Sequence, residues 1–311
     1  MNTHELLSKI TKLPVVADGL TEDILSGNFR SVFKGQGMEF DEARHYQWGD
    51  DARSIDWNAS ARLGTPFVKM FREERELTIL LLLDTSASMH GGLANLWGSA
   101  QSEKGEEQNP SPFEQALIAA ALIAFSAERS GQRVGAFLFD REIDRVFPPR
   151  KGRRNILAFV SGALQSRHSS PSMSRNEYTS NLRSAIVGAG RLLKRRSMIA
   201  LISDFHSAGW EQELCGLCGR HDVIAIRISD PMDEHLPDLG LITMRDPETG
   251  LQVAAPTGSA SFRGAWTQWH RERAELWQNH CRRAGAACLD LPVNADPAAA
   301  LTRFFGGRSG R

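Results

Sequence analysis

The clearest structural signal in the chain is residues 77–89, which read Leu-Thr-Ile-Leu-Leu-Leu-Leu-Asp-Thr-Ser-Ala-Ser-Met. The apolar run from Ile79 to Leu83 is short, so it predicts a strand buried on both faces rather than an amphipathic helix. The run ends at Asp84, and hydroxyls follow at alternate positions, Ser86 and Ser88. Open parallel sheets bind ligands outside the carboxyl ends of their strands. A carboxylate with neutral hydroxyls suits Mg²⁺ or Mn²⁺ there and suits zinc poorly.

A second segment repeats this pattern. Residues 198–205 read Met-Ile-Ala-Leu-Ile-Ser-Asp-Phe, so another apolar strand ends in a carboxylate, Asp204. A single aspartate at a strand end is usually a cap or turn residue. Two such strands in one parallel sheet would instead bring Asp84 and Asp204 together at the carboxyl ends of the strands.

The remaining hydrophobic patterns predict a doubly wound α/β fold of Rossmann type, with a mostly parallel sheet and helices on both faces. Residues 133–139 and 143–147 form a hairpin around a tight turn, which adds one antiparallel strand at the sheet edge. The other predicted strands are 221–228 and 287–291, with a further hairpin over 241–254. The predicted helices are 113–129, 182–193, 210–219, 261–284 and 297–305.

Residues 30–76 follow neither a helical nor a strand period. Charged residues alternate irregularly with aromatic ones, which indicates a folded loop segment shaped by its own ion pairs, or a partner surface. The segment contains the motifs Gly35-Gln-Gly-Met-Glu39-Phe40, Arg44-x-Tyr46, Gly49-Asp-Asp51-x-Arg53-x-Ile55-Asp-Trp57, Ser60-Ala-Arg62 and Val68-Lys69. They resemble the signature of the bacterial DUF58 family. Asp-x-Ser-x-Ser after a buried strand resembles the metal-ion-dependent adhesion site of von Willebrand factor A domains.

The resemblance covers residues 30–230 and implies a von Willebrand A-like domain behind the DUF58 segment. It implies that Thr179, just before the 182–193 helix, supplies a third hydroxyl, although a threonine there is also a common N-cap. Relatives often place Gly before and Asp after this threonine, where this chain has Tyr178 and Ser180. The candidate ligands of Mg²⁺ or Mn²⁺ are therefore Asp84, Ser86, Ser88, Thr179 and Asp204.

The resemblance also implies a domain plan and a function. Residues 1–76 would pack on the main domain, 77–230 would form the A-like domain, 231–305 would complete the same fold, and 306–311 would be disordered. Phe40, Tyr46 and Trp57 would make the packing contacts. DUF58 proteins look like partners of MoxR-type AAA+ ATPases in protein assembly or activation. An acidic side chain of a protein partner would complete the metal's coordination.

An enzyme is the alternative. Asp84 after a buried strand could be the nucleophile of a Mg²⁺-dependent phosphatase-like hydrolase, but Ser86 stands where such enzymes have a second aspartate as acid and base. The chain has no Gly-x-Ser-x-Gly elbow and no phosphate loop ending in Gly-Lys-Ser/Thr. Cys215 and Cys218 lack a second close pair for a zinc site. We therefore expect a binding module rather than an enzyme.

Composition limits the possible partners and location. The chain has 37 basic and 37 acidic residues in 311, so no overall field favours nucleic acid or an anionic membrane. No apolar stretch approaches 18 residues, so no membrane span is expected. The first residues lack the basic start and apolar core of a signal peptide, and four cysteines do not form a disulfide framework. We expect a cytoplasmic protein.

Overall fold

The computed structural model describes residues 39–48, 50–51, 55–72, 77–91, 110–166, 181–246, 248 and 250–308. These residues fall into two compact units, one within Phe29–Glu76 and the other from Leu77 onward. Among them no helix is both long and apolar enough to cross a membrane.

The larger unit is built on a six-stranded sheet in the order β10-β7-β6-β3-β4-β5. All neighbouring strands run parallel except β5, which is antiparallel to β4 at the edge. The strands are β3 (Thr78–Asp84), β4 (Arg133–Phe139), β5 (Ile143–Arg150), β6 (Met198–Ser203), β7 (Asp222–Ser229) and β10 (Ala287–Pro292). The predicted doubly wound fold and its antiparallel edge are confirmed.

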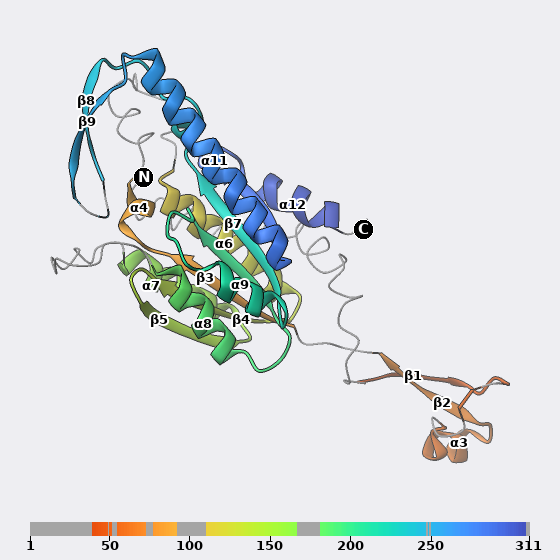
Figure 1. The fold of residues 1–311 in the computed structure, drawn as a ribbon. Coiled ribbons are helices and arrows are strands. Elements are labelled where there is room, and N and C mark those ends of the chain that lie inside the picture. Colours follow the sequence, from red (N-terminus) through yellow and green to blue (C-terminus); the bar gives the residue numbers. More distant parts are fainter. Residues whose placement is uncertain are drawn as a thin grey trace, which may run out of the picture. The chain divides into compact units, whose positions relative to one another are not determined.

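Helices cover both faces of this sheet (Figure 1). On one face α6 (Pro112–Arg129) contacts both α7 (Arg153–Ser166) and α12 (Pro297–Arg308). On the other face α9 (Glu211–Cys218) contacts both α8 (Leu182–Leu192) and α11 (Ala260–Ala284). The apolar side chains of β3 are almost completely buried between these layers, as expected for a central parallel strand.

The first helix of the core is α6, and its sequence explains where it begins. Ser111 and Glu114 form a reciprocal capping box, and Pro112 occupies the first turn, where its missing N–H costs nothing. Most of the helix is apolar and buried, so α6 runs through the interior rather than along a wet surface. It sits behind β3 and fixes that strand's position in the sheet.

Two features in the last third of the chain refine the predictions. The predicted hairpin is β8 (Leu241–Arg245) paired antiparallel with β9 (Gln252–Pro256). In α11 the indole of Trp277 is buried, that of Trp269 is half exposed, and that of Trp266 donates to Met232 O. The last helix continues to Arg308, so residues 306–308 are helical, and 309–311 lie outside the described residues.

The smaller unit contains more regular structure than its sequence pattern predicts. It contains two antiparallel strands, β1 (Glu39–His45) and β2 (Phe67–Arg72). A short helix, α3 (Trp57–Leu63), is capped by Asp56 and stops at Gly64, whose φ of 70° is left-handed. The ion pair between Arg44 and Asp50 at 2.7 Å agrees with a segment shaped by its own charges. Packing of residues 1–76 on the main domain stays a prediction.

Candidate metal centre

The centre lies where the winding of the sheet changes direction. Strand β3 pairs with β4 on one side and with β6 on the other. The chain adds β4 and β5 on one side of β3 and then crosses to the other side, where it adds β6, β7 and β10. Ligands of doubly wound folds bind at this switch point, outside the carboxyl ends of the strands. Asp84 is the last residue of β3 and Asp204 directly follows β6. The prediction that both aspartates lie at the same end of the sheet, where the parallel strands have their carboxyl ends, is confirmed.

Asp84 is held rigidly by two hydrogen bonds. The Ser86 N–H donates to its Oδ1 at 2.9 Å, and the Ser203 hydroxyl donates to its Oδ2 at 2.6 Å. All three residues are fully buried. Ser203 was given no role from the sequence, because it is the last residue of an otherwise apolar strand and looks like the beginning of a turn. Its contact with Asp84 spans 119 residues and depends on β6 lying beside β3.

The two predicted serines lie together. Ser86 is the N-cap residue of the short helix α4 (Ala87–His90), yet its side chain makes no capping hydrogen bond. Its hydroxyl instead lies 3.0 Å from the hydroxyl of Ser88. An N-cap serine normally uses its oxygen on the helix N–H groups. Here both oxygens remain beside the aspartates and are available as ligands.

Asp204 is positioned by a turn with an unusual backbone conformation at the next residue. Phe205, the next residue, has a φ of 58°, a left-handed conformation that is costly for a bulky side chain. Its ring contacts those of Trp210 and Trp277, each with centroids 5.5 Å away, which holds the turn in place. Asp204 then accepts the His206 N–H at 3.0 Å and lies 3.3 Å from the His206 imidazole.

Thr179, the fifth predicted ligand, lies outside the described residues. The residue that caps α8 is Asn181, whose side chain accepts the Ser184 N–H at 3.0 Å. The alternative interpretation of Thr179 as the N-cap is therefore wrong. The Asn181 N–H donates to the carbonyl oxygen of Asp140, which directly follows β4. This contact brings the start of α8 to the carboxyl ends of the parallel strands.

Glu248 was not predicted to be near the centre. It lies in the turn between β8 and β9, and its Oε1 accepts the Ser88 N–H at 2.9 Å. The two residues are 160 positions apart. No local pattern in the sequence could have indicated this contact.

Comparison with known proteins identifies the family of the chain. A family model described as "Protein of unknown function DUF58" matches residues 42–275. The chain belongs to the DUF58 family. An uncharacterised protein of Mycobacterium tuberculosis, Rv1480, is 30% identical to this DUF58 chain over 305 residues, which cover 98% of this chain and 90% of the relative.

Solved structures similar to this DUF58 protein include BatB from Bacteroides thetaiotaomicron, at 17% identity and a TM-score of 0.43. The match covers 76% of this chain and all of BatB. The VWA domain of SpRpn10 is 12% identical with a TM-score of 0.39, over 73% of this chain and 94% of that domain. The fold assignment itself rests on the strand order and directions described above.

The two aspartates ionise very differently in the DUF58 chain. Burial, together with the neighbouring Asp204, raises the pKa of Asp84 to about 7. Burial also opposes ionisation of Asp204, but the charge and hydrogen bonds of His206 outweigh it and lower the pKa to about 2. Asp204 is therefore ionised at neutral pH. Asp84 is only partly ionised there, because its buried charge faces another carboxylate.

The donor set fits a hard divalent cation. Within the described residues no Lys or Arg acts on the Asp84 carboxylate, and no three His, Cys, Asp or Glu side chains are arranged to hold a metal. The set instead combines two carboxylates with serine hydroxyls, which are oxygen donors suited to Mg²⁺ or Mn²⁺. Asp84, Ser86, Ser88 and Asp204 would hold such an ion, which would supply an electrophilic centre for another oxygen ligand. The four cysteines are free thiols, so they form no disulfide.

A cavity of about 240 Å³ adjoins the centre on the Asp204 side. Its walls come from the turn after β6 and from α11, and they are basic and aromatic, including His206, Arg273 and Trp277. Three buried polar atoms on these walls have no hydrogen-bond partner: the Ser207 hydroxyl, Nε2 of His270 and Nε1 of Trp277. The surface beside the acidic centre is thus suited to polar and acidic groups.

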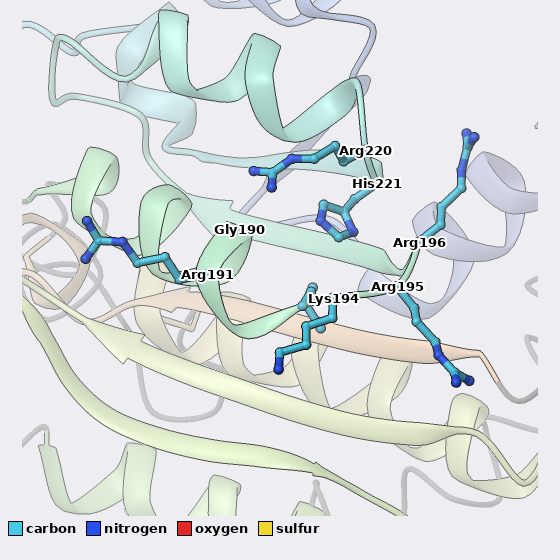
Figure 2. Close-up of a pocket in the computed structure, with 8 residues that line it drawn as sticks. Gly190, Arg191, Lys194, Arg195, Arg196, Arg220 and His221 are labelled. Carbon is cyan, nitrogen blue, oxygen red and sulfur yellow. The ribbon is translucent and has the colours of Figure 1, made fainter.

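A larger cavity, of about 500 Å³, lies near the opposite ends of the strands (Figure 2). It is lined by basic residues and by His221, which is buried at the amino end of β7. Figure 2 shows that Arg191, Arg195 and Arg196 point in different directions instead of converging on one position. It offers no carboxylate or hydroxyl ligands, so it is not the metal centre.

Proposed function

We propose that this DUF58 protein is a metal-dependent protein-interaction module. Mg²⁺ or Mn²⁺ would be held by Asp84, Ser86, Ser88 and Asp204, with Thr179 as a further ligand implied by the family resemblance. The observation that carries the proposal is the buried carboxylate of Asp84. It lies beside Asp204 and the hydroxyls of Ser86 and Ser88, which bond to each other, with no basic side chain of the described residues to neutralise it.

The charge balance favours an acidic ligand from a partner. Two carboxylates neutralise a divalent ion, while the neutral serine hydroxyls leave it electrophilic. A Mg²⁺ ion takes six oxygen ligands, so the protein positions leave room for at least one more. The basic wall formed by His206 and Arg273 lies next to Asp204 and would attract an incoming carboxylate.

A hydrolytic role for Asp84 has less support. Its side chain is completely buried and both carboxylate oxygens accept hydrogen bonds, so the group is poorly placed to attack a substrate. The residue two positions on is Ser86, which cannot serve as a carboxylic acid and base. A binding role uses the same atoms without requiring Asp84 to move.

Among partners, the family resemblance favours a MoxR-type AAA+ ATPase. The test is capture of that ATPase from the same organism on the immobilised protein, with Mg²⁺ or with excess chelator. We expect binding in Mg²⁺, loss in chelator and recovery when Mg²⁺ is restored. Asp84→Ala should not bind, whereas Asp144→Ala, which removes an exposed carboxylate of β5, should bind normally. Equal capture by wild type in chelator and by Asp84→Ala would overturn metal-dependent binding.

A further inference from the structure

We propose that the basic cavity at the amino ends of the parallel strands is a binding site for polyphosphate anions, the class that includes pyrophosphate and the phosphate chain of a nucleotide. It is the cavity of about 500 Å³ drawn in Figure 2, and its volume is within the range of small-molecule sites. The site lies at the opposite end of the sheet from the metal centre, so it adds a second binding function that does not depend on the first.

The cavity walls carry a positive charge that no carboxylate among the described lining residues balances. The walls come from residues 190–196, at the end of α8 and before β6, and from residues 220–221, between α9 and β7. The lining residues with a permanent positive charge are Arg191, Lys194, Arg195, Arg196 and Arg220. Helix carboxyl ends attract basic residues, but the two helices that end here together supply only about one negative charge. The remaining excess of positive charge favours an anion that carries several charges.

A buried histidine without partners points to a ligand at this site. His221 is only 3% exposed, and neither of its ring nitrogens has a hydrogen-bond partner among the described residues. Buried polar atoms are normally hydrogen-bonded, so an unpartnered pair on a cavity wall indicates a contact with a bound group. Burial, together with the charges of Arg220 and Arg196, lowers the pKa of His221. The ring is therefore uncharged at neutral pH, and one of its nitrogens carries an N–H that can donate.

Arg220 lies on the same wall, and a glycine makes room for it. A Cβ at position 190 would lie 2.8 Å from Nη2 of Arg220, closer than such atoms approach, so the guanidinium needs Gly190 to lie against α8. Figure 2 shows Arg220 extending from the turn before β7 toward α8. Within the described residues the guanidinium makes one long hydrogen bond, from Nε to Gly216 O at 3.5 Å, and no ion pair. Its two terminal nitrogens can therefore donate together to one phosphate group.

A polyphosphate matches this arrangement better than a single carboxylate does. A carboxylate has one charge and two oxygens, which Arg220 alone would satisfy, whereas a phosphate group has nearly two charges and three acceptor oxygens for Arg220 and His221. Arg191, Arg195 and Arg196 point in different directions, so they suit further phosphates rather than the first one. The described lining residues include no Phe, Tyr or Trp on which a base could stack. Recognition would therefore depend on the phosphates and not on a nucleoside attached to them.

A simpler role must be separated from this one, because basic residues at helix carboxyl ends can act only by stabilising those ends. Arg220→Gln removes the charge and the forked donor. His221→Phe keeps a buried ring but removes both nitrogens, a change that the simpler role does not expect to affect any ligand. Arg154→Gln, at an exposed position of α7 outside the cavity, is the matched control for the loss of one positive charge.

The test is calorimetric titration of the full chain with pyrophosphate and, separately, with ADP, in excess chelator so that no metal takes part. We expect both anions to bind with similar affinity. Arg220→Gln and His221→Phe should each weaken binding by about tenfold, the usual effect of losing a hydrogen bond to a charged group. Arg154→Gln and Asp84→Ala should bind both anions as wild type does, because neither residue lines the cavity.

The outcomes separate this proposal from the metal centre and from other basic surfaces. Wild type that binds neither anion would overturn the polyphosphate site and leave the metal centre untouched. Equal affinity of wild type and Arg220→Gln would also overturn it, whether or not His221→Phe folds. ADP that binds far more tightly than pyrophosphate would contradict recognition through phosphates. Sedimentation with anionic lipid vesicles, without binding of pyrophosphate, would make the cavity part of a membrane-facing surface instead.

Discussion

Replacing Asp84 by asparagine should have opposite effects on the protein with and without metal. In the metal-free chain, burial and the nearby Asp204 raise the pKa of Asp84 from 3.8 to about 7. The folded protein therefore binds more protons than the unfolded chain between these values, so the free energy of unfolding falls as the pH rises from about 4 to 7. A shift of roughly 3 pH units corresponds to at most about 4 kcal/mol at pH 8.

Asparagine removes this cost and keeps the shape of the side chain. The Ser86 N–H can still donate to the amide oxygen, and the Ser203 hydroxyl can turn to accept from the amide nitrogen. We expect Asp84→Asn in chelator at pH 8 to be more stable than wild type by about 1–4 kcal/mol, with a correspondingly higher Tm. At pH 4, where Asp84 is protonated, the difference should vanish.

Mg²⁺ should reverse the order of the two proteins. A ligand that binds only the folded state stabilises it in proportion to the logarithm of its concentration over Kd. Wild type should therefore gain stability in Mg²⁺, whereas Asp84→Asn should not respond. The assay is urea unfolding at pH 4 and pH 8, in chelator and in Mg²⁺, with Asp144→Asn as the control. An Asp84→Asn protein that is less stable than wild type at pH 8 in chelator would refute the reasoning.

Further predictions concern the ligands, the protons and the amino-terminal segment. Ser86→Ala and Ser88→Ala should each weaken Mg²⁺ binding by about tenfold in calorimetry while the metal-free Tm changes little; unchanged affinity would exclude the hydroxyls as ligands. Because Asp84 titrates near neutral pH, Mg²⁺ binding at pH 7 should release about half a proton, and affinity should fall as the pH is lowered from 8 to 6. Calorimetry in two buffers of different ionisation enthalpy measures this release, and none at all would mean that Asp84 is already ionised. A chain that starts at Glu76 should be insoluble or melt at a lower temperature, and an unchanged Tm would make residues 1–75 an independent appendage.

The strands and the main acidic residues could be predicted because their signals are local. An apolar run that ends in a carboxylate indicates both a buried strand and a residue at its carboxyl end, and this pattern located Asp84 and Asp204 correctly. The parallel pairing of β3 with β6 then brings the two side chains together without any further information from the sequence.

The rest of the centre depends on contacts that no local pattern contains. Ser203 is buried in an apolar strand, and its role appears only when β6 lies beside β3. Glu248 reaches Ser88 from a turn 160 residues away. The pKa of Asp84 follows from burial and from a second carboxylate, both of which are tertiary effects. In the smaller unit, α3 is too short to show a period, and β1 is both short and highly charged.

The most direct test of the central claim is anomalous diffraction from crystals of the full chain grown with Mn²⁺. We predict one strong Mn²⁺ peak at the carboxyl ends of β3 and β6, with oxygen atoms of Asp84, Ser86, Ser88 and Asp204 around it, directly or through water. Mg²⁺ in the same place should show octahedral oxygen ligands at about 2.0–2.1 Å. Saturating Mn²⁺ that gives no peak between Asp84 and Asp204, or a peak only elsewhere, would contradict the account.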